Sequence, residues 1–226
     1  MTYHIIVEIA SSYSVLLPLS VGIYKARCMR PRSLYIFLLW LVSTAIINLL
    51  NVILAASDIN NLLIMQLYTL LEFTFLTLLY RAIVRRKIIR KAATFCLAAF
   101  FIFKVIDMRY ITGLYQIDTW AITIESMVMI AFGFFCFAQL LDEKNSTLVG
   151  KPVFWINTGI LVYFSGSFFI FLYSTYIFSH AEEYYMYWSI HNMLVIVRDV
   201  LFAIGMIVLS SSDANPLGRA RVLATY

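Results

Sequence analysis

The chain has 226 residues, of which 62% are hydrophobic and only 13% are charged. Soluble domains contain about 45–50% apolar and about 25% charged residues, so this composition excludes an ordinary soluble domain and predicts an integral membrane protein. The net charge of +5 does not indicate nucleic-acid binding, because the basic residues lie in short segments between apolar runs, where they set membrane topology.

Seven apolar runs are long enough to cross a bilayer, which takes about 20 helical residues. The predicted helices cover residues 4–24, 33–56, 62–83, 92–110, 120–141, 154–178 and 185–210. We therefore predict an all-α bundle of seven transmembrane helices that forms a single domain over residues 1–226. Basic residues concentrate in the first and third loops and in the tail, so the positive-inside rule predicts an N-terminus outside and a C-terminus in the cytoplasm of a plasma (inner) membrane.

The first two predicted helices carry polar residues on defined faces. Glu8 and Ser11 fall on one face of the first helix, and Pro18 predicts a kink in it. Asn48 and Asn51 share a face of the second helix. These asparagines either form hydrogen bonds between helices or line a pocket.

The third, fourth and fifth predicted helices each place an ionisable side chain at membrane depth. Glu72 lies near the middle of the third helix, with Tyr68 one turn earlier. A carboxylate in that position is protonated, pairs with a cation or binds a metal. In the fourth helix Lys104 lies three residues before Asp107, so it either pairs with that aspartate or extends to the membrane interface. Glu125 lies in the incoming third of the fifth helix.

The seventh predicted helix is the most polar inside its span. His191 and Arg198 are seven residues apart and share one face, while Asn192 and Asp199 share the neighbouring face. A buried arginine needs a carboxylate, and Glu72 is the best partner by depth, with Asp199 as the local alternative. Such a pair either fixes the register of the helices or belongs to a functional site.

The predicted topology places these polar side chains in the outer half or at the centre of the membrane. The cytoplasmic half is rich in Phe, Leu and Ile instead. We therefore predict a polar cavity that opens outward above an apolar floor. Its candidate ligand-binding residues are Glu72, Glu125, His191, Arg198, Asp199, Asn48, Asn51, Tyr68 and Lys104.

Glu72, Glu125 and His191 also form a candidate metal-binding set, because carboxylates and imidazole are ligands of zinc and other first-row metals. They lie on separate helices without HExxH-type spacing, so no motif supports this set. The sequence has no GxSxG elbow, P-loop or dinucleotide-binding fingerprint, and residues 165–167 are interpreted as a helix-packing pattern. The last helix contains no lysine for a Schiff base, so retinal is not predicted.

Two stretches carry a resemblance to known proteins. YTLLEF (residues 68–73) and FWINTGILVYFSGSFF (residues 154–169) resemble stretches of seven-helix membrane proteins from Bacteroidetes-like bacteria. The span count, the outside N-terminus and the polar seventh helix resemble sensor-type modules that sit beside histidine kinases. The resemblance implies a membrane sensor, and because the sequence shows no appended signalling domain, we expect it to act through a cytoplasmic or membrane partner.

Three functions stay open from the sequence. A ligand-sensing or accessory signalling subunit is favoured by the missing catalytic motifs and by the pocket-like depth of the polar residues. A membrane-embedded enzyme acting on lipid-type substrates would use Glu72, Glu125 or His191 as acid, base or metal ligand. A proton-coupled transporter would use Glu72, Arg198 and Asp199 as a relay, although no internal repeat supports it.

Overall fold

The computed structural model describes residues 2–26, 32–114, 116–143, 147–173 and 181–209, and side chains in all but residues 2 and 181–184 of these. Within these ranges every regular element is a helix, which confirms the prediction of an all-helical protein. The helices are α1 (Thr2–Ser14), α2 (Leu16–Tyr24), α3 (Arg32–Ala56), α4 (Leu62–Ile83), α5 (Lys87–Ile106), the π-helical turn η2 (Asp107–Ile111), α6 (Thr119–Leu141), the short 3₁₀ turn η3 (Leu148–Gly150), α7 (Pro152–Leu172) and α9 (Ala181–Val208).

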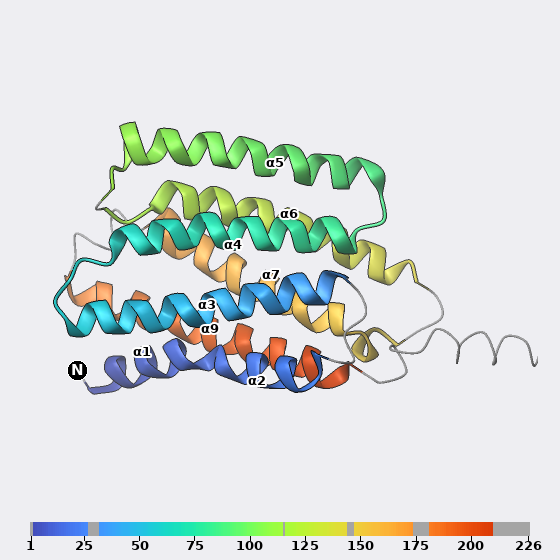
Figure 1. The fold of residues 1–226 in the computed structure, drawn as a ribbon, viewed down its shortest axis with the longest axis horizontal. Coiled ribbons are helices and arrows are strands. Elements are labelled where there is room, and N and C mark those ends of the chain that lie inside the picture. The colour runs from blue at the N-terminus through green and yellow to red at the C-terminus, as the bar shows by residue number, and fades with distance from the viewer. Residues whose placement is uncertain (1, 27–31, 115, 144–146, 174–180, 210–226) are drawn as a thin grey trace, which may run out of the picture.

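The long helices lie side by side in one elongated bundle (Figure 1). α9 packs against α7, α1 and α2, and α6 packs along α7. α4 contacts α3 and α5, and α5 lies at the edge of the bundle (Figure 1). The end of the bundle that holds the N-terminus is here called the N-terminal end, and the opposite end, where Lys25, Arg85 and Lys151 lie, is called the basic end.

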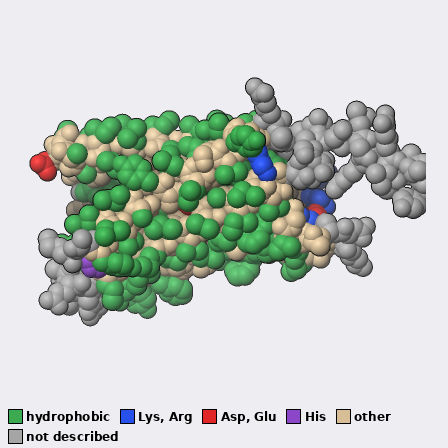
Figure 2. Space-filling model, turned by 90° about the horizontal axis from the view of Figure 1, so that it is seen from below, with side chains coloured by type: hydrophobic (Ala, Val, Ile, Leu, Met, Phe, Trp, Pro, Cys, Tyr) green, Lys and Arg blue, Asp and Glu red, His purple; other side chains and the backbone are tan. Residues whose placement is uncertain are grey.

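Six helical stretches are long and apolar enough to cross a membrane, which is the architecture of a multi-pass membrane protein. They are Tyr3–Tyr24, Arg32–Ala56, Leu62–Ile83, Thr119–Leu141, Pro152–Leu172 and Tyr185–Val208. Hydrophobic side chains cover the length of the face seen in Figure 2, and the Lys and Arg side chains visible there lie at one end. α5 does not belong to the six, because its 20 residues include Lys87, Arg90, Lys91 and Lys104.

The first membrane helix is interrupted near Pro18, as the sequence predicts. α1 ends at Ser14 and α2 begins at Leu16, so Val15 lies between two helices. Proline has no N–H to donate to the carbonyl four residues earlier, so the helix loses the hydrogen bond to Ser14 and breaks one turn before the proline.

The fourth predicted helix starts earlier than the hydropathy pattern indicates. Its predicted range was 92–110, whereas α5 begins at Lys87 and ends at Ile106, followed by η2. Lysine and arginine are good helix formers, so the basic residues extend the helix beyond its apolar part. The predicted ends of the sixth and seventh helices, residues 174–178 and 210, lie outside the described residues.

Two glycines of α7 allow α9 to approach closely, which confirms the interpretation of small residues as packing positions. A Cβ added at Gly159 would lie 2.7 Å from the Phe202 ring and 3.2 Å from the carbonyl oxygen of Arg198. A Cβ at Gly166 would collide with the side chain of Leu194. The α7–α9 contact therefore fixes the position of the helix that carries Arg198.

Replacing Gly159 with leucine is expected to separate α7 from α9 and to lower the free energy of unfolding by about 1–3 kcal/mol, as overpacking does in protein cores. Thermal unfolding in mild detergent measures this change. Ala92→Leu is the control, because Ala92 is exposed on α5. Equal unfolding midpoints for the two variants would contradict the close α7–α9 contact.

Candidate functional site

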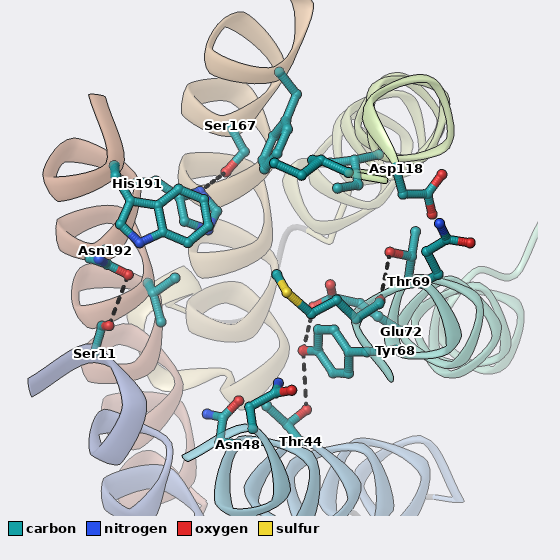
Figure 3. A pocket seen from close by; sticks show the side chains of 18 of the residues that line it. Ser11, Thr44, Asn48, Tyr68, Thr69, Glu72, Asp118, Ser167, His191 and Asn192 are labelled. Carbon is teal, nitrogen blue, oxygen red and sulfur yellow. Dashed lines mark hydrogen bonds between the residues drawn. The ribbon is translucent and has the colours of Figure 1, made fainter. Parts of the chain in front are cut away.

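A cavity of about 430 Å³ lies inside the bundle, in the half nearest the N-terminal end (Figure 3). Its wall is built from α1, α3, α4, α6, α7 and α9 together with the segment before α6. The lining extends from Asn61 and Gln116 at the N-terminal end to Glu72 and Arg198 at mid-depth. Most of the residues that the sequence predicts as a site reach this wall, namely Glu72, Glu125, His191, Arg198, Asn48, Asn51 and Tyr68.

Aromatic side chains pack beneath Arg198, next to the residues that line the cavity, and are here called the floor. The side chains of Phe37, Trp40 and Phe202 are almost completely buried, and the Phe37 and Trp40 rings each meet the Phe202 ring edge-on. The guanidinium carbon of Arg198 lies 4.5 Å from the centre of the Tyr163 ring, 5.4 Å from that of Trp40 and 5.7 Å from that of Phe202. Cation–π contacts of this kind stabilise a charge that has left water.

Arg198 meets both carboxylates that the sequence offers as partners. Its Nε donates to Oδ1 of Asp199 at 3.0 Å, and its Nη1 lies 3.5 Å from Oε1 of Glu72. Asp199 does not line the cavity; it lies behind Arg198, completely buried, and its Oδ2 accepts a hydrogen bond from Ser14 at 2.6 Å. The ion pairs therefore connect α4 and α9 to α1 at membrane depth.

A second set of hydrogen bonds joins α3 and α4 above the floor. The Tyr68 hydroxyl donates to Oε1 of Glu72 at 3.1 Å and lies 3.3 Å from Oγ1 of Thr44 (Figure 3). Since Glu72 also contacts Arg198, this set and the arginine pairs share one carboxylate. The polar groups of α3, α4, α9 and α1 therefore form one continuous network.

The asparagines join helices and line the cavity at the same time. Nδ2 of Asn48 donates to the Ser12 carbonyl oxygen at 3.1 Å, and Nδ2 of Asn61 donates to Oδ1 of Asn51 at 3.3 Å. On α9, Asn192 is bonded to the Ser11 hydroxyl at 2.9 Å (Figure 3). The two interpretations of the asparagines left open by the sequence therefore both apply.

His191 meets a serine that sequence reasoning assigned to packing alone. Oγ of Ser167 lies 3.4 Å from Nδ1 of His191 (Figure 3). The imidazole stacks on Trp188 with ring centres 5.2 Å apart, and the rings of Phe171 and Tyr163 lie within 6 Å of it. The serine and the histidine are 24 residues apart on α7 and α9, so no local sequence signal could have linked them.

Lys104 pairs with Asp118, so neither alternative drawn from the sequence, pairing with Asp107 or extension to the membrane interface, is found. The Lys104 ammonium and the Asp118 carboxylate form a buried ion pair, with 1% and 3% of the two side chains exposed. Oδ1 of Asp107 accepts a hydrogen bond from Thr112 at 2.7 Å instead. The i, i+3 rule considers only the helix itself, whereas Asp118 comes from the segment that precedes α6. Lys104 thus lies behind the cavity wall, while Asp118 is part of it.

Asp118 lies outside the membrane-spanning stretches, and its carboxyl group has a perturbed pKa. The pKa of Asp118 is raised from 3.8 to about 6, because burial and the neighbouring Asp107 raise it more than the hydrogen bond and charge of Lys104 lower it. This acid therefore changes its charge close to neutral pH, at the N-terminal end of the cavity.

The candidate metal ligands do not come together. Glu72, Glu125 and His191 line the cavity from three helices, α4, α6 and α9. Among the residues that the structure describes, no three His, Cys, Asp or Glu side chains are grouped as ligands of one metal ion would be. The geometry therefore gives no support to the metal-binding set suggested by the sequence.

Comparisons of the chain with protein-family models, with curated proteins and with solved structures find no match. The chemistry of the site is therefore inferred from its own geometry. The resemblance to sensor-type membrane modules stays a prediction from the sequence.

Asp199→Asn is expected to destabilise the protein more than Glu72→Gln. Each carboxylate has two partners, but Asp199 holds Arg198 at 3.0 Å and Ser14 at 2.6 Å, whereas Glu72 holds Arg198 at 3.5 Å and Tyr68 at 3.1 Å, so replacing Asp199 removes the shorter contacts. Breaking a buried ion pair costs about 3–5 kcal/mol, and we expect Asp199→Asn in this range and Glu72→Gln below it. Thermal unfolding in mild detergent compares the two. Asp58→Asn, at an exposed position in a loop, is the control, and a larger loss for Glu72→Gln would contradict this order.

The raised pKa of Asp118 predicts a pH-dependent stability. Because the folded-state pKa lies above the ordinary value of 3.8, protonation favours the folded protein. This contribution is fully present below pH 3.8 and is lost as the pH rises through about 6. Unfolding midpoints measured from pH 4 to pH 7 should therefore fall less steeply for Asp118→Asn than for the wild type. Parallel profiles for the two proteins would exclude Asp118 as the titrating group.

Proposed function

We propose that this chain is a seven-span inner-membrane protein that binds a small polar ligand in its cavity and acts as a ligand-sensing or accessory signalling subunit through a partner. The observation that carries the proposal is the cavity itself, with a volume of about 430 Å³ and a wall of charged and polar side chains inside the bundle. Small-molecule sites typically enclose about 300–1,000 Å³ and combine apolar lining with a few polar groups.

α5 is proposed as the seventh span. Its 20 residues would extend about 30 Å, which is the thickness of the hydrocarbon core. Ile88, Phe95 and Ile102 on its surface are exposed, while Phe100 stacks on Phe73 of α4 with ring centres 3.8 Å apart. Its basic first turn would lie at the membrane surface, and Lys104 is neutralised by Asp118.

The distribution of charge supports the proposed orientation. Lys25, Arg85, Arg86 and Lys151 lie at the basic end, and the N-terminal end has Asp58 in the loop between α3 and α4. The positive-inside rule would place the basic end in the cytoplasm. The cavity would then face the outside, with its aromatic floor towards the cytoplasm.

The floor favours binding over passage or catalysis. Phe37, Trp40 and Phe202 fill the interior below Arg198, where a transport path would need polar groups. Among the residues that line the cavity, Ser167 and His191 come nearest to a nucleophile and base, and their separation of 3.4 Å exceeds the usual catalytic hydrogen bond of about 2.6–3.2 Å. The closer pair of His4 and Ser189, 2.5 Å apart, lies outside the lining. The wall therefore supports recognition of a ligand better than chemistry on it.

α9 offers a route from the cavity to a cytoplasmic partner. Its cavity side carries His191, Asn192 and Arg198. At its other end the carbonyl oxygens of Ile207 and Leu209 accept hydrogen bonds from Nζ of Lys25, with the Leu209 bond at 2.8 Å. A ligand that changes the contacts of Arg198 would bias the position of α9 at the basic end.

Val195→Trp is expected to prevent ligand binding, because Val195 lines the cavity and an indole would occupy much of it. Val197→Trp is the matched control, since Val197 lies on the same helix and is 46% exposed on the bundle surface. Native mass spectrometry of protein purified in mild detergent should detect a bound small molecule in the wild type and in Val197→Trp, and none in Val195→Trp. A wild-type protein without a bound molecule, or equal occupancy in all three, would overturn the proposed function.

A further inference from the structure

Three buried oxygen atoms on the cavity wall have no hydrogen-bond donor among the described residues. They are Oε1 of Gln66, Oδ1 of Asp118 and Oε1 of Glu125. Each belongs to a side chain that is at most 3% exposed. Buried polar groups without partners are costly, and the few that native structures retain often mark a functional site.

The orientation of the Gln66 amide is fixed by its neighbours. Nε2 donates to the carbonyl oxygens of Gly113 at 2.8 Å and of Gln116 at 2.9 Å. Two carbonyl partners require the nitrogen on that side, so the oxygen is the atom left without a partner. Asn192 gives no such evidence, because the Ser11 hydroxyl can satisfy its amide in either orientation.

The charges around the cavity are predominantly acidic. Glu8, Glu72, Asp118 and Glu125 line it. Among the described residues of the wall, one is a lysine or arginine, namely Arg198. Its charge is already neutralised by Asp199 and Glu72. Lys104 behind the wall is matched by Asp118. An anionic ligand would therefore meet carboxylates without a free cation, whereas a cationic ligand would meet Glu125 without a competing ion pair.

The unpaired acceptors and the aromatic side chains come from different elements. Gln66, Asp118 and Glu125 belong to α4, to the segment before α6 and to α6, whereas Phe171 and Trp188 belong to α7 and α9. In Figure 3, Asp118 and Thr69 lie across the cavity from His191 and Asn192. The wall therefore offers hydrogen-bond acceptors on one side and an aromatic surface on the other.

We infer that the ligand is a small organic cation, a primary amine with an apolar body. Its ammonium group donates hydrogen bonds to Glu125, Gln66 and Asp118, and its apolar body packs against the aromatic side chains of α7 and α9. An ammonium has three N–H donors, which matches three acceptors, and hydrogen bonds to charged groups are the stronger ones. This inference rests on the proposed function, because it names the ligand class of the same cavity.

Three probes that share a phenyl ring and differ in their polar group test the inference: 2-phenylethylamine, 2-phenylethanol and 3-phenylpropanoate. Each is titrated calorimetrically into the detergent-purified full chain at pH 7. The amine should bind at least about tenfold more tightly than the alcohol or the acid, since a hydrogen bond to a charged group contributes about 1.5–3 kcal/mol. Glu125→Gln should remove this preference for the amine over the alcohol. Asp58→Asn is the matched control and should behave as the wild type, because Asp58 lies outside the cavity.

The outcomes separate this inference from the proposed function. Three results would overturn the inference that the ligand is an organic cation. They are preferential binding of the alcohol or the acid, an amine affinity that Glu125→Gln leaves unchanged, and no binding of any probe. The proposed function is judged separately by the molecule that co-purifies with the wild type and is lost in Val195→Trp. The probe comparison in the wild type requires no variant, so it decides the ligand class even where Glu125→Gln does not fold.

Discussion

A guanidinium group at membrane depth cannot lose its charge, because arginine stays protonated throughout the accessible pH range. Arg198 therefore imposes a requirement on every helix around it. Asp199 meets this requirement from the same helix, Glu72 meets it from α4, and the rings of Tyr163 and Trp40 add cation–π contacts. The interior is arranged so that one cation on α9 is shared by neighbouring helices.

This sharing explains why the polar groups form a network. Glu72 accepts from Tyr68, which reaches Thr44 on α3, and Asp199 accepts from Ser14 on α1. Each group satisfies a neighbour that would otherwise lie unpaired in a medium without water. A change at Arg198 is therefore transmitted to α1, α3 and α4 together. Such coupling is what a sensing module requires, because a ligand can shift only contacts that differ between two states.

The sequence predicted the helices and the central ion pair, because both depend on patterns within a helix. Apolar runs gave six of the observed spans, and depth along the helices correctly selected Glu72 and Asp199 as partners of Arg198. Prediction was wrong where the partner comes from an irregular segment: Lys104 bonds Asp118, which precedes α6. No sequence pattern indicated a role for Gln66, because that role depends on two carbonyl groups of the segment before α6.

A cavity inside a membrane bundle sacrifices packing contacts and leaves polar groups without protein partners. In this protein the sacrifice is local, because the floor below Arg198 is filled by Phe37, Trp40 and Phe202. The unpaired oxygens of the cavity wall, on Gln66, Asp118 and Glu125, lie instead in the half nearest the N-terminal end. Buried acceptors without a protein donor are unfavourable, and donors on a ligand would recover this free energy on binding rather than on folding. A filled floor beneath a wall with unpaired oxygens is therefore the physical basis for the proposed recognition of a ligand.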